Sequence, residues 1–133
     1  MRKMAPRYHT PIPEHLIQRA VFDHLRARSL PGVFAFAVPN GGYRRPTEAA
    51  IFKGGGVIAG IPDVIIIKSG RMYALELKRV GGKVSREQHN TMKDLTECGA
   101  TCAVAYGIDA AIIQLEDWQL LRGKSPRQSV PVR

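Results

Sequence analysis

Residues 60–79 read GIPDVIIIKSGRMYALELKR, and this stretch decides the fold. A β-branched run, a Ser-Gly-Arg turn and a second segment of alternating residue types are typical of two antiparallel strands joined by a tight turn. In the second strand, Glu76 and Lys78 share one face, because side chains alternate across a strand. The turn lies midway between Asp63 and Glu76. The hairpin is therefore expected to bring these two carboxylates together.

The flanking sequence predicts further helices and strands around this hairpin. Apolar residues recur at helical spacing in four segments, and short β-rich runs lie between them. We expect helices over residues 13–28, 47–53, 85–98 and 109–121, and strands over residues 33–38, 63–68, 72–79 and 101–106. This order predicts an α/β fold in which a mixed central sheet is flanked by helices.

The polar residues of the hairpin predict a metal site. Two neighbouring carboxylates repel each other, and one takes up a proton unless a cation lies between them. A hard divalent ion such as Mg²⁺ or Mn²⁺ meets that need with oxygen ligands. Lys78 adds a positive charge suited to an attacking water or a developing phosphorane oxygen. The alternative is an ordinary surface ion pair of Lys78 with Glu76 or Asp63 on an edge strand.

Two further polar residues are predicted to face inward. Glu14 lies on the apolar side of the first helix and is a candidate third carboxylate, with Gln18 one turn later as an alternative occupant of the rim. The other explanation is a first-turn acid stabilised by the helix dipole. Gln88 aligns with the apolar side of a later helix. It either positions groups near Lys78 or forms a capping box with Ser85.

The motifs of this chain and their order along the sequence resemble those of the VRR-Nuc family of the PD-(D/E)xK nuclease superfamily. The resemblance covers about residues 14–121. It is carried by Pro39-Asn40-Gly41-Gly42, Gly60-Ile61-Pro62-Asp63, Glu76-Leu77-Lys78 and Ser85-x-x-Gln88. It implies a restriction-endonuclease-like core and metal-dependent cleavage of phosphodiester bonds. The implied metal ligands are Glu14, Asp63, Glu76 and the Leu77 carbonyl, and the implied catalytic residues are Asp63, Glu76, Lys78 and Gln88.

The charge of the chain points to a polyanionic partner. Among its 133 residues, 20 Lys and Arg against 11 Asp and Glu give a net charge of +9. Nucleic acid is the commonest partner of such a domain, although a solvated basic surface is the alternative. We expect one domain over residues 12–121 between basic segments at residues 1–11 and 122–133. The residues expected to contact DNA are Asn40, Arg44, Arg45, Lys53, Arg79, Lys83 and Arg86.

Taken together, the sequence predicts a Mg²⁺- or Mn²⁺-dependent DNA endonuclease. The resemblance is to stand-alone phage and bacterial members, some of which are similar to Holliday-junction resolvases. It therefore implies selectivity for branched DNA, and a two-fold symmetric junction suits a homodimer. The alternatives are a nicking or flap-type nuclease with the same site, and a non-catalytic basic DNA-binding module. Apolar runs too short to span a membrane, no signal peptide and only two cysteines predict a cytoplasmic protein.

Overall fold

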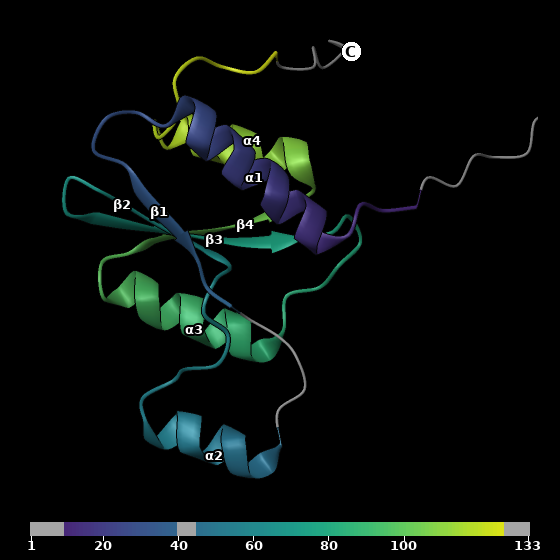
Figure 1. Ribbon diagram of the computed structural model, residues 1–133, viewed down its shortest axis with the longest axis vertical. Helices are drawn as coiled ribbons and strands as arrows, with labels where there is room; N and C mark the ends of the chain where they lie inside the picture. Colours follow the sequence, from purple (N-terminus) through teal and green to yellow (C-terminus); the bar gives the residue numbers. More distant parts are fainter. Residues whose placement is uncertain (1–9, 40–44, 127–133) are drawn as a thin grey trace, which may run out of the picture.

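A computed structural model describes residues 10–39 and 45–126 and shows one mixed sheet between helices (Figure 1). The strands lie in the order β1-β2-β3-β4, and β3 runs antiparallel to β2 and parallel to β4. The predicted α/β class and the predicted order of elements are confirmed. The elements are α1 (Glu14–Arg28), β1 (Phe34–Ala37), α2 (Pro46–Gly54), β2 (Val64–Lys68), β3 (Arg71–Lys78), α3 (Arg86–Glu97), β4 (Thr101–Tyr106) and α4 (Ile108–Asp117).

The hairpin of β2 and β3 sets the register of the site. Ser69 and Gly70 both have positive φ angles, 52° and 74°, as a two-residue type I′ turn requires. The last strand pair is Val64 with Leu75. The next pair in that register is Asp63 with Glu76. The turn thus places the two acids opposite each other, as the sequence predicts.

The two faces of the sheet have different roles. Helices α1 and α4 cover one face, and α3 covers the other (Figure 1). Leu75 and Leu77 of β3 point into the main core under α1 and α4, where they join Ile17 and Val21 of α1. The residue between them, Glu76, contacts α3 on the opposite face. One strand therefore supplies both the core and the polar site.

The C-terminal part of the domain differs from the prediction. Helix α4 ends at Asp117 and not at residue 121, because Gln119 adopts a left-handed conformation with φ 60° that stops the helix. The buried side chains of Leu120 and Leu121 still complete the core. Within the segment predicted as a basic tail, Ser125 donates two hydrogen bonds to the buried carboxylate of Glu116.

Helix α2 stands apart from this core. Every residue of α2 is exposed, and the helix lies beyond α3 in Figure 1. The predicted short helix over residues 47–53 is confirmed, with Pro46 at its first position. Across the described residues, we find no helix that combines the length and the apolar character of a membrane span.

Candidate active site

The two predicted carboxylates meet at the end of the hairpin. Asp63 directly precedes β2, and its Oδ2 accepts a hydrogen bond of 2.8 Å from the backbone N–H of Leu77. Glu76, the neighbour of Leu77, is only 1% exposed. Burial and then the negative charge of Asp63 raise the pKa of Glu76, the second as expected for two close carboxylates. The predicted juxtaposition of Asp63 and Glu76 is confirmed.

The carboxylate of Glu76 has two different oxygens. Its Oε1 accepts a 2.8 Å hydrogen bond from Gln88 Nε2 and lies 3.6 Å from Lys78 Nζ. Its Oε2 is buried and accepts no hydrogen bond from any described residue. Burial is the main cause that raises the pKa of Glu76 from 4.5 to about 8, while Lys78 acts in the opposite direction. One oxygen is held in place, and the other lacks a donor.

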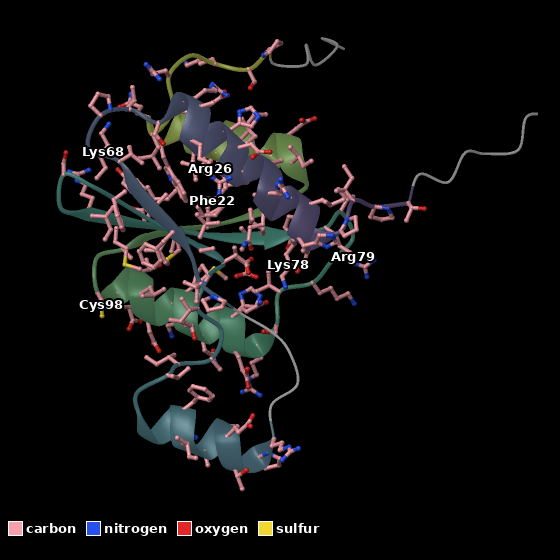
Figure 2. The ribbon with its side chains drawn as sticks, in the orientation of Figure 1. Phe22, Arg26, Lys68, Lys78, Arg79 and Cys98 are labelled. Atoms are coloured by element: carbon pink, nitrogen blue, oxygen red, sulfur yellow. The ribbon has the colours of Figure 1, made fainter. Side chains whose placement is uncertain are left out.

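Lys78 does not form a surface ion pair on an edge strand. Strand β3 is internal to the sheet, between β2 and β4, and Lys78 is only 8% exposed. Burying an ammonium group beside a carboxylate removes water from both charges, which costs free energy. The ion pair is therefore weak evidence that Lys78 stabilises the fold. Figure 2 shows Lys78 at the end of the sheet, next to the exposed Arg79. The ammonium group is therefore placed to act on a ligand at this edge.

Gln88 serves both of the roles that its position in the sequence allows. Ser85 caps α3, because its Oγ accepts from the Gln88 backbone N–H and its own N–H donates to Gln88 Oε1 at 2.9 Å. The other end of the same amide donates to Glu76. Since Oε1 is engaged by Ser85, Nε2 must face the carboxylate. The capping box thus fixes the direction of the amide that holds Glu76.

Variants at Ser85 and Gln88 separate these two roles. Ser85→Ala removes the capping side chain and is expected to lower the free energy of unfolding by about 1 kcal/mol, with little change in the DNA cleavage that the sequence motifs imply. Gln88→Ala also removes the donor to Glu76 and is expected to slow cleavage about ten-fold or more. Thermal unfolding in EDTA and cleavage rates with metal measure both effects. Equal cleavage by the two variants would show that Gln88 only caps the helix.

The loop that carries Asp63 is fixed on α3 by two contacts that the sequence does not reveal. The buried Thr91 donates a 2.7 Å hydrogen bond to the carbonyl of Ala59. Gly60 has a φ of +80°, and a Cβ there would lie 2.6 Å from the Glu87 carbonyl oxygen. The only sequence signal for Thr91 is its place one turn after Gln88, on the inward side of α3. Helix α3 thus holds both the Asp63 loop and the carboxylate of Glu76.

Gly60→Ala is expected to disrupt this contact. The new Cβ clashes with helix backbone and also adopts an unfavourable φ, which together are expected to cost about 2 kcal/mol or more of unfolding free energy. Gly70→Ala is the matched control, since its φ is +74° but no atom lies within 4 Å of the added Cβ. Denaturant unfolding measures the difference. If Gly60→Ala and Gly70→Ala lower the unfolding free energy equally, α3 must move to accommodate the new Cβ of residue 60.

Glu14 is not brought into the carboxylate group. The prediction that it faces inward is wrong: it is exposed at the first residue of α1, where the helix extends past the apolar contacts that begin at Ile17. Helix α1 also covers the face of the sheet opposite to Gln88 and α3 (Figure 1). Among the described residues, no three His, Cys, Asp or Glu side chains are grouped to hold a metal ion. A role of Glu14 as a metal ligand stays a prediction. Gln18 is half-buried on α1.

The residues predicted to bind DNA are placed around two segments. Arg45 and Lys53 lie at the two ends of α2. Three more follow β3 and lead into α3, and all five are exposed: Arg45, Lys53, Arg79, Lys83 and Arg86. Asn40 and Arg44 lie outside the described residues. The exposed cations between β3 and α3 adjoin Lys78, which is consistent with an anionic ligand at this edge.

The oxygens at this site fit a hard divalent cation. Asp63 keeps one carboxylate oxygen besides the one bonded to Leu77, and Glu76 Oε2 lacks a donor. A buried carboxylate oxygen without a hydrogen bond is costly, and a cation bound by oxygens removes that cost. The Leu77 carbonyl belongs to the peptide between Leu77 and Lys78 and is a third candidate ligand. These groups can share one ion without Glu14.

Two of the solved structures that are similar to this chain carry the family name that the motifs suggest. One, "VRR_NUC domain protein", is similar with a TM-score of 0.69 and 24% identity over 83% of this chain and 90% of that chain. Another, "VRR_NUC domain", has a TM-score of 0.53 and 17% identity over 78% and 94% of the two chains. By sequence, no family model and no curated protein matches. The structural likeness and the sequence motifs agree, and the chain has the fold of the VRR-Nuc domain.

Proposed function

We propose that this protein is a nuclease of the PD-(D/E)xK type that hydrolyses DNA phosphodiester bonds with a divalent metal ion. The observation that carries this proposal is the buried, donor-free Glu76 Oε2 beside Asp63. Two carboxylates this close need a proton or a cation between them, and a divalent ion bound by oxygens meets that need in a nuclease. The fold shared with VRR-Nuc domain proteins supports the same activity. The full proposal is an endonuclease that uses Mg²⁺ or Mn²⁺.

Each residue of the site has its own proposed role at the scissile phosphate. Asp63 and Glu76, with the Leu77 carbonyl, would hold the metal, which when bound polarises a phosphate and lowers the pKa of a water molecule. Gln88 keeps Glu76 in one orientation through its 2.8 Å hydrogen bond. Lys78 positions the nucleophile or stabilises the charge that develops on the phosphate oxygens. The resemblance implies products with a 5′-phosphate and a 3′-hydroxyl.

The proposed substrate is branched DNA such as a Holliday junction, cut by a homodimer. The net charge of +9 and the exposed cations near Lys78 support binding to a DNA backbone. No groove-reading helix is recognisable in the sequence, which favours recognition of backbone shape. A two-fold symmetric junction would match two copies of one small domain.

A cleavage panel tests this function. Four-way junctions, flaps, linear duplex and plasmid are incubated with Mg²⁺, Mn²⁺ or EDTA, and the products are resolved on denaturing gels. We expect cleavage with metal, none in EDTA, and the highest rate on junctions. Binding without metal-dependent cleavage of any substrate would instead identify a non-catalytic DNA-binding module. Cleavage of flaps but not junctions would support the nuclease activity and contradict the proposed preference for branched junctions.

A further inference from the structure

A second basic surface lies on the side of the sheet away from α3. Between helix α1 and the end of strand β1 there is a groove of about 510 Å³, a size that accommodates a ligand as large as a nucleotide. Phe22 and Arg26 extend from α1 in this region (Figure 2). The residues that line the groove are His15, Gln18, Arg19, Phe22, Arg26 and Ala37.

The cations of this groove are available to an anionic ligand. Arg19 is exposed and forms no ion pair with any residue that the structure describes. Arg26 contacts Asp23 at 3.5 Å, but both side chains are more than half exposed, so the pair is weak. Arg26 lies seven positions after Arg19 in the helix, a rise of about 10 Å, which equals roughly three nucleotides of a stacked strand. Their spacing suits two phosphates about three nucleotides apart on one strand.

One end of the groove lies close to the loop that carries Asp63. Ala37 lines the groove and ends β1, and the backbone N–H of the next residue, Val38, donates a 2.8 Å hydrogen bond to the carbonyl of Asp63. The partly buried ring of Phe22 packs on the main core and gives the groove an apolar floor, with the Arg26 guanidinium 5.8 Å from its centre. Aromatic rings among cations are typical of sites for single-stranded nucleic acid.

We propose that this groove between α1 and β1 binds the phosphodiester backbone of a single nucleic-acid strand that continues to Asp63. The inference rests on the proposed nuclease function and adds a binding surface separate from the cations of α2 and of the segment between β3 and α3. Arg19 and Arg26 bind phosphates, and Phe22 contacts a base or sugar. The volume of the groove is that of a site for about one nucleotide, so we expect it to take the unpaired part of a substrate.

The test compares binding by two charge-matched variants in EDTA, where cleavage does not interfere. The first is Arg19→Gln/Arg26→Gln, and the control is Arg71→Gln/Lys93→Gln, which removes two exposed cations that do not line the groove. Fluorescence anisotropy with a labelled oligothymidine and with a short duplex gives affinities at several salt concentrations. We expect the groove variant to bind the single strand about ten-fold or more weakly and to lose about 1.4 from its salt slope.

The outcomes separate this inference from the proposed function. Equal single-strand binding by the groove and control variants would overturn the inference, even if the wild-type protein cleaves DNA with metal. A loss of the same size for duplex and single strand would also overturn it, because the groove would then have no preference for unpaired DNA. A selective loss for the single strand supports it, whether or not the wild-type protein cleaves.

Discussion

We expect Asp63→Asn to remove almost all of the proposed DNA cleavage while the protein stays folded. Asparagine can still accept the hydrogen bond from Leu77, so the hairpin is retained, but the charge that a divalent ion requires is lost. Lys78→Ala is expected to have a similar effect on cleavage by removing the positive charge beside Glu76. Each variant should lower the single-turnover cleavage rate by on the order of 10²- to 10³-fold. Rates are measured with excess protein over labelled DNA.

Measurements of DNA binding and of thermal unfolding distinguish a loss of catalysis from a loss of binding or folding. Both variants should bind DNA in EDTA with nearly wild-type affinity, because the exposed cations that are expected to contact phosphates are unchanged. The unfolding temperature of Asp63→Asn should match or exceed that of the wild type, since a carboxylate next to the buried Glu76 is gone. Cleavage at the wild-type rate in either variant would show that the active site lies elsewhere.

Glu76→Gln is expected to stabilise the metal-free protein at alkaline pH. The pKa of Glu76 rises from 4.5 to about 8 on folding, so its contribution to stability is present below pH 4.5 and is lost as pH rises towards 8. Glutamine stays neutral and can still accept from Gln88. The variant should therefore match the wild type near pH 5 and exceed it near pH 8.5, by on the order of a few kcal/mol. Denaturant unfolding in EDTA at both pH values measures the difference.

Addition of metal should reverse this ranking. In the wild-type protein at pH 8.5, Mg²⁺ or Mn²⁺ should raise the unfolding temperature, since an ion that binds only the folded state stabilises it. Glu76→Gln lacks the charged ligand and should show little response. Near pH 5 the wild-type response should shrink, because the ion competes with the proton on Glu76. A pH-independent stability difference between wild type and variant would contradict the raised pKa.

The hairpin and the juxtaposition of its polar side chains were predictable because both depend on local rules. A two-residue turn with positive φ fixes the register, and the register alone places Asp63 opposite Glu76. The alternation along β3 then predicts that Glu76 and Lys78 share one face. The capping box at Ser85 is likewise a short-range pattern. In these segments, residue type and spacing are sufficient to predict the geometry.

The errors and omissions concern contacts between distant segments. The helical wheel places Glu14 on the apolar side of α1, but periodicity does not show where the neighbouring elements end, and Glu14 lies exposed at the first residue of the helix. The hydrogen bond from Thr91 to Ala59 and the close approach of Gly60 to α3 depend on how a loop docks on a helix. The dual use of the Gln88 amide becomes visible only when Glu76 is in place.

Residues of strand β3 alternate between leucines of the core and polar groups of the site. A change in the length of β3 therefore affects the core and the site together. Inserting or deleting a single amino acid after Tyr73 would exchange the two faces of β3. Leu75 and Leu77 would then point towards α3, and Glu76 and Lys78 would point into the apolar core. Loss of activity and loss of folding would then occur together. Evolution or engineering of new specificities on this scaffold is therefore confined, within β3, to point substitutions.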